Sequence, residues 1–221
     1  AINIMPWSFY WHYGDKQMLE QFYPHMVAQL GFMRQVVDEE GVMEMKDPCR
    51  WKNLGDWVAP GPLPKQAMVH TYFYWVCNKL TSYAADALGK HDEAEQLENE
   101  AERARQGFMK RFWDEEEQGY GPYGGNVFAL SMGVDEERLE LVCEALRKNI
   151  EANDYHLDTG IYGTRLLFET LANHGMVDLA YQIINQRTRP SFGWWIEQGA
   201  TTTWEQWDGN NSRNHPMFGG S

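Results

Sequence analysis

The chain has 221 residues, a formal net charge of −13 and a mean hydropathy of −0.60. Its length suffices for one well-formed core, and no shift in composition divides it, so we predict a single domain over residues 1–221. The negative charge would repel phosphate backbones and anionic lipids, and no apolar run reaches the roughly 18 residues of a membrane helix. We therefore expect neither a nucleic-acid partner nor a membrane partner.

Cysteine and histidine usage argues against a metal or a cofactor. Cys49, Cys77 and Cys143 are odd in number and far apart, so they support neither a disulfide framework nor a zinc site, and we expect buried thiols. The seven histidines show no metal-ligand spacing with one another or with a cysteine. The chain begins Ala-Ile-Asn-Ile, without a basic region or a cleavage pattern, and its localisation stays open.

Apolar residues recur at intervals of three and four along most of the chain, which is typical of amphipathic helices. In chain order we expect a helix ending near Tyr13, with Asp15 as the N-cap of the next. Further helices are expected to about residue 40, and over about 64–88, 92–113, 126–132, 136–151, 164–173 and 178–186.

The expected helices are of two kinds. The helix over 64–88 is apolar nearly all round, whereas the helix over 92–113 is polar on one side. Short connections between successive helices favour antiparallel neighbours, and buried helices alternating with amphipathic ones are typical of an (α/α) barrel. We therefore predict an all-α fold, with enough chain for about four helical hairpins.

The segment Trp204-Glu-Gln-Trp207 places Glu205 between two indoles. A pyranose ring can stack on an indole while a carboxylate beside it handles a proton or a water molecule. The same pattern also fits two core tryptophans around a solvated or helix-capping acid. Three threonines before the segment and a turn-rich stretch after it indicate a shaped loop, which favours the chemical interpretation.

Four segments carry a family resemblance. They are Pro190–Gly209 followed by Asn214-His215, Pro6–Tyr10 followed by Tyr13-Gly14-Asp15, Gly55–Gly61 (Gly-Asp-Trp-Val-Ala-Pro-Gly), and His156–Thr164. Together they resemble the catalytic domain of the bacterial α-L-rhamnosidases, glycoside hydrolase family 78. The resemblance implies an (α/α)6 barrel of six hairpins, incomplete in this chain. It also implies inverting hydrolysis of terminal α-L-rhamnosides, with a rhamnose-containing carbohydrate as substrate.

The same resemblance implies roles for individual residues. Glu205 matches the general base, which activates a water molecule, and the loop with Asp56 and Trp57 matches one that lines the sugar pocket. Judged from the residues alone, Asp56 could instead cap its loop while Trp57 fills the core. Glu197 is the rival carboxylate, although we expect it to anchor its loop by hydrogen bonds.

Further side chains complete the predicted site. His156 and His215 could each bond sugar hydroxyls, and Trp204 could supply a stacking face. Of Trp194 and Trp195, one should face the pocket and the other the core, because adjacent residues do not share a direction. We expect all these residues to converge with Asp56, Trp57 and Glu205 on one concave face.

One part of the family pattern is missing. The family's general acid lies in a segment resembling D-x-x-x-x-x-E-x-x-x-W-x-G-D, which no stretch here fits; the nearest is Trp51–Asp56. We therefore expect the acid to come from a missing N-terminal part of the same domain, and this chain alone to be inactive. The alternatives are another six-hairpin glycosidase, or a non-catalytic carbohydrate-binding or scaffold domain.

Overall fold

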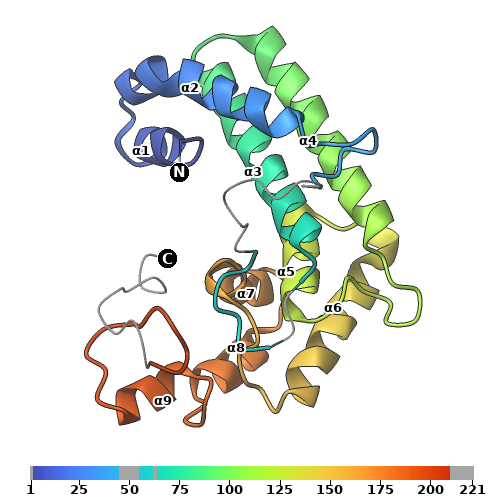
Figure 1. The fold of residues 1–221 in the computed structure, drawn as a ribbon, viewed down its shortest axis with the longest axis vertical. Helices are drawn as coiled ribbons and strands as arrows, with labels where there is room; N and C mark the ends of the chain where they lie inside the picture. The colour runs from blue at the N-terminus through green and yellow to red at the C-terminus, as the bar shows by residue number, and fades with distance from the viewer. Residues whose placement is uncertain (1, 45–54, 62–63, 210–221) are drawn as a thin grey trace. The chain divides into compact units, whose positions relative to one another are not determined.

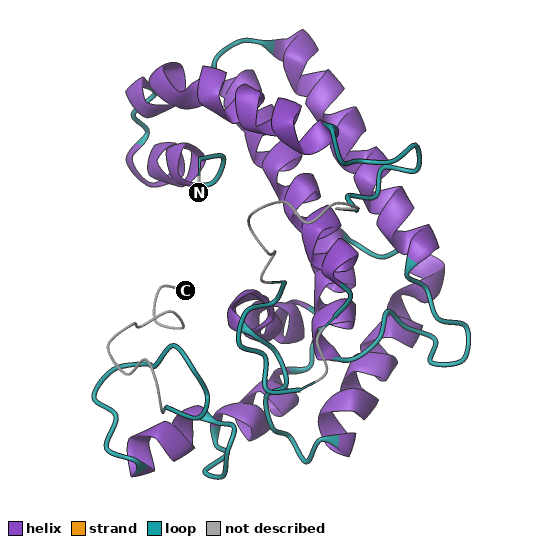
Figure 2. Ribbon diagram, in the orientation of Figure 1, coloured by secondary structure: helices purple, strands orange, loops and turns teal. Residues whose placement is uncertain are grey.

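The computed structural model of the protein describes residues 2–44, 55–61 and 64–209. These residues form helices and connecting loops without a strand, as predicted for an all-α fold (Figures 1 and 2). The helices are α1 (Met5–Tyr13), α2 (Gln17–Arg34), α3 (Gln66–Ala87), α4 (His91–Arg111), α5 (Tyr123–Met132), α6 (Glu136–Ala152), α7 (Ile161–Asn173), α8 (Val177–Ile184) and α9 (Phe192–Glu197).

The chain forms two compact units that interleave along the sequence. Unit 1 comprises Ala1–Lys52 and Ala67–Arg111, and it holds α1, α2, α4 and nearly all of α3. Unit 2 comprises Asn53–Gln66 and Phe112–Ser221, and it holds α5 to α9. Each unit therefore draws on two separate stretches of chain.

The first two helices meet at a glycine-capped turn. Gly14 adopts a positive φ of 69° and its N–H donates to the carbonyl of Tyr10, which ends α1 where the sequence predicts. The N-cap of α2 is Lys16 rather than the expected Asp15. Asp15 still contributes, because its Oδ1 accepts the N–H of Gln17 at 2.9 Å.

Helix α2 ends at Arg34, well before the expected end near Glu40. The chain then turns, and Oδ1 of Asp38 accepts the N–H of Glu40 at 3.0 Å and that of Val42 at 2.9 Å. This turn buries Val42 and Met43, so apolar residues that continue the helical pattern reach the core by another route. Burial by a turn cannot be distinguished from burial by a helix in so short a segment.

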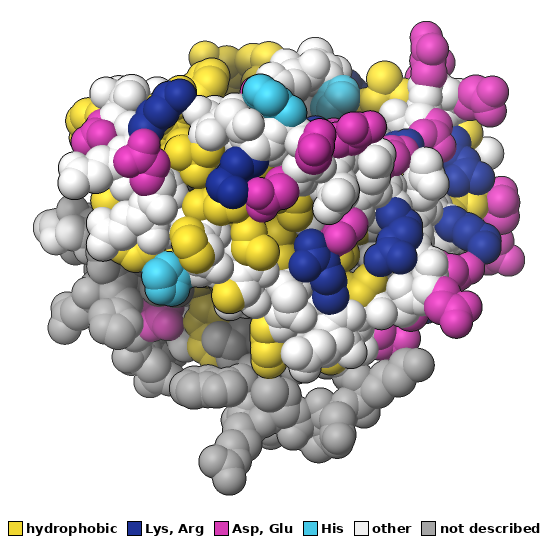
Figure 3. Space-filling view, turned by 90° about the horizontal axis from the view of Figure 1, so that it is seen from above, with side chains coloured by type: hydrophobic (Ala, Val, Ile, Leu, Met, Phe, Trp, Pro, Cys, Tyr) yellow, Lys and Arg dark blue, Asp and Glu magenta, His cyan; other side chains and the backbone are white. Residues whose placement is uncertain are grey.

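Helices α2, α3 and α4 build the core of unit 1. The expected contrast between α3 and α4 is confirmed: α3 buries residues on most of its surface, whereas α4 buries one face. Polar contacts join the three helices at Glu100 of α4, which accepts from Tyr74 Oη at 2.8 Å and from Arg34 Nε at 2.8 Å. Acidic and basic side chains also alternate on the face shown in Figure 3, with apolar side chains between them.

Two helical glycines of unit 1 give a prediction with its own control. A Cβ on Gly107 of α4 would overlap the backbone carbonyl of Glu40, whereas a Cβ on Gly31 of α2 would meet nothing within 4 Å. Alanine is favoured over glycine in helices by about 1 kcal/mol. We therefore expect Gly31→Ala to stabilise the chain by roughly 0.5–1 kcal/mol and Gly107→Ala to destabilise it.

Urea unfolding, monitored by circular dichroism, measures the change in the free energy of unfolding for both variants. If Gly107→Ala were as stabilising as Gly31→Ala, the close approach of the 38–43 turn to α4 would be wrong.

In unit 2, α5 packs against both α6 and α7, and α7 packs against α8. In unit 1, α1 packs against α2, and Lys79 of α3 pairs with Glu98 of α4. The described helices thus form four pairs, followed by the short α9. Helix α9 was not predicted from the sequence; Ser191 caps it, because its Oγ accepts the N–H of Trp194 at 3.0 Å.

Within the described residues, no helix combines the length and the apolar character needed to span a membrane. Cys77 and Cys143 are free and half-buried. Burial raises the pKa of the Cys77 thiol to about 11 and also raises the pKa of Cys143. Cys49 lies outside the described residues.

Candidate active site

Three segments of unit 2 that are far apart in sequence meet in the structure. They are the loop 55–61, the turn 156–160 that leads into α7, and the segment 199–209 that follows α9. Trp57 Nε1 donates to Glu205 Oε1 at 3.3 Å, and Trp207 Nε1 donates to the carbonyl of Thr159 at 3.3 Å. The structure therefore brings the predicted base beside the predicted pocket loop.

Asp56 is completely buried at the N-terminus of α7. Its Oδ2 accepts the N–H of Gly160 at 2.7 Å, and its Oδ1 accepts those of Tyr162 at 2.9 Å and Gly163 at 3.0 Å. Burial raises the pKa of the Asp56 carboxyl, and the three amide donors act in the opposite direction. This geometry agrees with a capping role, while the predicted contact with a sugar hydroxyl stays a prediction.

Trp57 is held by its backbone as well as by its ring. Its carbonyl accepts the N–H of Ile161 at 3.0 Å, so the loop and the first turn of α7 share a backbone hydrogen bond. A Cβ on Gly160 would overlap the carbonyls of both Asp56 and Trp57, so only glycine allows this approach. Trp57 and Glu205, which the hydrogen bond from the indole joins, are both half-buried.

A cluster of aromatic rings supports the segment that carries Glu205. Trp195 stacks on Trp207 with ring centroids 4.5 Å apart and an angle of 18°, and its Nε1 donates to the carbonyl of Trp207 at 3.2 Å. Trp204 packs against Trp195 at 5.9 Å and edge-on against Trp194 at 6.2 Å. Glu205 thus follows a tryptophan that is fixed within a packed cluster.

The two adjacent tryptophans of α9 differ as expected in one respect. Trp195 is 2% exposed and belongs to the core, whereas Trp194 is half-buried. Trp204 is 4% exposed. The sugar contacts expected for Trp194 and Trp204 stay predictions.

The two histidines of the predicted site have different outcomes. His156 joins two loops: its Nε2 lies 2.7 Å from Thr188 Oγ1, and its Nδ1 lies 3.1 Å from the carbonyl of Asn153. These are contacts that fix a loop, and the expected contact with a sugar stays a prediction. His215 lies outside the described residues.

One contribution to the site was missed in the sequence: Asp158, beside Thr159, is a buried acid that packs against Gly61. Trp207 was singled out as an indole beside Glu205, but its place in the aromatic cluster and its hydrogen bond to the carbonyl of Thr159 were not predicted. Thr159 and Trp207 are 48 residues apart, so no local sequence pattern predicts their hydrogen bond. For α9, by contrast, Ser191 directly before the apolar segment 192–196 is a local N-cap signal that could have been recognised.

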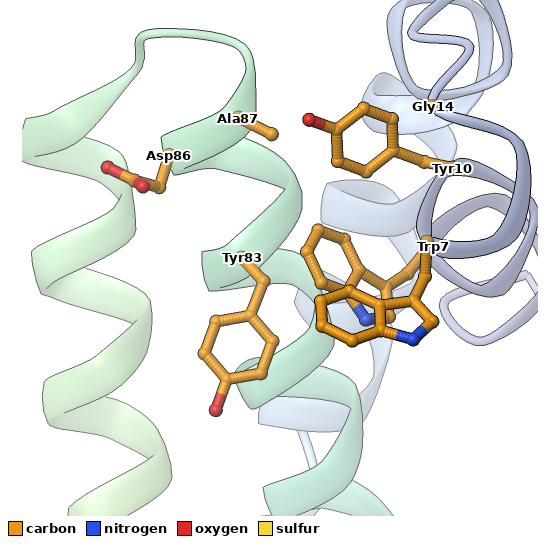
Figure 4. Close-up of a pocket in the computed structure, with 7 residues that line it drawn as sticks. Trp7, Tyr10, Gly14, Tyr83, Asp86 and Ala87 are labelled. Atoms are coloured by element: carbon orange, nitrogen blue, oxygen red, sulfur yellow. The ribbon is translucent and has the colours of Figure 1, made fainter.

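A separate groove lies in unit 1, between α1 and the C-terminal end of α3 (Figure 4). Its volume is about 710 Å³, and aromatic side chains dominate its walls. Trp7 lies at its centre, with ring centroids 5.4 Å from Tyr83 and 5.6 Å from Tyr10. None of its residues belongs to the predicted site.

The geometry can support one half of an acid–base pair. Glu205 is a half-buried carboxylate that accepts an indole N–H, and a carboxylate held in this way is the kind of group that serves as a general base. In the described part of the chain, no group of three or more His, Cys, Asp or Glu side chains could hold a metal ion.

Comparison with known proteins gives a consistent result. The chain is 31% identical to an α-L-rhamnosidase of Streptomyces avermitilis over 97% of its own length, and 28% identical to one of Alteromonas sp. over 99%. It spans 21% and 26% of those two proteins, respectively.

Solved structures agree with this relationship. An α-L-rhamnosidase from Dictyoglumus thermophilum matches with a TM-score of 0.88 and 32% identity, over 98% of this chain and 26% of that one. The Streptomyces avermitilis enzyme in complex with L-rhamnose matches with a TM-score of 0.83 and 28% identity, over 97% of this chain and 21% of that one. The family described as the bacterial α-L-rhamnosidase six-hairpin glycosidase domain matches residues 1–221, and the chain belongs to that family.

Proposed function

We propose that this chain is part of the catalytic domain of an α-L-rhamnosidase and supplies its general base, Glu205. The observation that carries the proposal is the hydrogen bond from Trp57 to Glu205, which joins two segments of the family pattern 148 residues apart. The relatives over the whole length of the chain are named α-L-rhamnosidases, which supports a rhamnose-containing carbohydrate as the substrate.

The proposed reaction inverts the configuration at the anomeric carbon. Glu205 removes a proton from a water molecule, and the oxygen of that water forms a bond to the anomeric carbon as the bond to the leaving oxygen breaks. A carboxylic acid on the opposite side gives its proton to the leaving oxygen. In enzymes of this kind the two carboxyl groups stand about 6.5–9.5 Å apart, which leaves room for the water.

The acid is expected from a part of the same domain that this sequence does not contain. Two facts support this: no stretch of the chain fits the family's acid segment, and the chain spans only about a quarter of its relatives' length. The missing segment would then be the chain's principal partner.

The purified chain should therefore show no turnover of an aryl α-L-rhamnoside. The same assay on a protein that carries this chain with the rest of its six-hairpin domain should show turnover, because both carboxyl groups are then present. Aryl glycosides of other sugars serve as controls.

Turnover by the chain alone would mean that an acid within residues 1–221 is the proton donor. Preference for another sugar would indicate a different six-hairpin glycosidase, and binding without turnover by the complete domain would indicate a non-catalytic carbohydrate-binding domain.

A further inference from the structure

The carboxylate of Asp56, which the family resemblance led us to expect in the sugar pocket, is completely buried. A buried carboxylate is costly unless its oxygens accept hydrogen bonds. Here three backbone amides at the start of α7 donate to it, at 2.7–3.0 Å. We name this set of three hydrogen bonds the Asp56 clamp.

The clamp joins the loop 55–61 to the N-terminus of α7, two segments that are far apart in the sequence. Gly160 is the N-cap of α7, and Tyr162 and Gly163 lie in its first turn, where the N–H groups have no partner within the helix. Asp56 supplies that partner from more than 100 residues away, and it fixes the loop 55–61 on the positive end of the helix dipole. The amide of Ile161, bonded to the carbonyl of Trp57, tightens the same junction.

The next residue passes this constraint to the site. Trp57 follows Asp56 directly, its carbonyl is fixed on α7, and its indole N–H reaches Glu205 Oε1 at 3.3 Å. The clamp therefore fixes the backbone of Trp57, and the hydrogen bond to Glu205 fixes its indole ring. A shift of the loop would move the donor away from Glu205.

We propose that Asp56 is a positioning residue, which holds Trp57 against α7 so that the indole N–H orients the carboxylate of Glu205. This rests on the proposed role of Glu205 as the base, but it assigns Asp56 a task other than contact with the sugar. The two assignments differ in their kinetics. Misorientation of the base lowers kcat, whereas loss of a sugar contact made throughout the reaction raises KM.

The first test is kinetic and uses a protein that carries this chain with the rest of its domain. Asp56→Asn replaces one acceptor oxygen by an amino group, so it can satisfy at most part of the clamp. We expect kcat on an aryl α-L-rhamnoside to fall by up to roughly 100-fold, the effect of a displacement of about 1 Å, with KM nearly unchanged. Asp178→Asn, the same change at an exposed acid of α8, should leave both constants unchanged.

A double-mutant cycle with Trp57 makes the test specific. If Asp56 acts through the indole, then Asp56→Asn should lower kcat by less than about threefold once Trp57→Phe has removed the N–H donor, because residues acting in series are not additive. A full additional loss in that background, a rise in KM with kcat retained, or an unchanged kcat in Trp57→Phe alone would each overturn the proposal.

Gly160→Ala gives a second route should Asp56→Asn fail to fold. The added methyl group pushes the backbone of Asp56 and Trp57 away from α7 without changing the chemistry of the carboxylate, so it should lower kcat in the same Trp57-dependent manner.

Amide hydrogen exchange on the 221-residue chain tests the clamp without any activity. The N–H groups of Gly160, Tyr162 and Gly163 should exchange slowly in the unaltered chain and faster in Asp56→Asn. If the complete domain hydrolyses no rhamnoside but these amides respond, the proposed function fails and the clamp stands. If the amides are unaffected, the clamp itself is wrong.

Discussion

Replacing Glu205 by glutamine in a protein that carries the complete domain is expected to reduce kcat on an aryl α-L-rhamnoside by at least roughly 100-fold, the loss typical of a positioned general base. The amide oxygen of glutamine can still accept the hydrogen bond from Trp57, so the geometry is retained while the proton acceptor is lost. Circular dichroism should therefore be unchanged, and initial rates at saturating substrate measure the effect.

Glu197 provides the matched control. It is exposed, and its Oε1 lies 3.4 Å from Arg187 Nη1 in a surface ion pair, which contributes little to stability. Glu197→Gln makes the same chemical change as Glu205→Gln and should leave turnover near normal. If the two variants behave in the opposite way, Glu197 is the base and the assignment of Glu205 is wrong.

Truncating Trp195 to alanine is expected to have the largest effect on stability. The side chain is 2% exposed, stacks on Trp207 and donates a hydrogen bond to its carbonyl. Removing a buried tryptophan costs about 3–5 kcal/mol, a large share of the roughly 5–15 kcal/mol by which a domain is stable. The midpoint of urea unfolding, followed by circular dichroism, should fall accordingly.

A substitution at the neighbouring Ile196 tests whether any truncation in α9 destabilises the protein to the same degree. Ile196 is 70% exposed, so Ile196→Ala should change the free energy of unfolding by no more than about 0.5 kcal/mol. Should Trp195→Ala cost no more than Ile196→Ala, the aromatic cluster would not be the support of the 199–209 segment described above.

Helices with a long and regular apolar pattern could be predicted closely from the sequence. The expected helices over 92–113 and 136–151 correspond to α4 at His91–Arg111 and α6 at Glu136–Ala152. The apolar pattern predicts too long a helix where a turn buries the apolar residues, as it does after α2. Helix α9 has only six residues, which is too short for a helical pattern to be recognised. Helix α7 begins at Ile161, before the expected residue 164, because Asp56 caps it from a distant segment.

The site shows the same division between local and distant information. The pattern around Glu205 indicates a carboxylate among indoles, and the family resemblance indicates the loop with Trp57. Their contact, across 148 residues, depends on the packing of unit 2 and on the approach of Gly160. Likewise, the sequence shows an acid at position 56, but only the structure shows that both of its oxygens face backbone amides.

The interleaving of the two units governs the order in which the chain can be completed during synthesis. Asp56 is made 104 residues before its first partner, Gly160, and the α3 and α4 segments of unit 1 are made in between. Its carboxylate must therefore remain hydrated until α7 emerges from the ribosome. For the same reason unit 2 cannot be excised as one continuous piece: a fragment beginning at residue 112 would lack the acceptor for three amides at the N-terminus of α7. Its dissection would require residues 53–66 to be joined to residue 112 by a linker in place of residues 67–111.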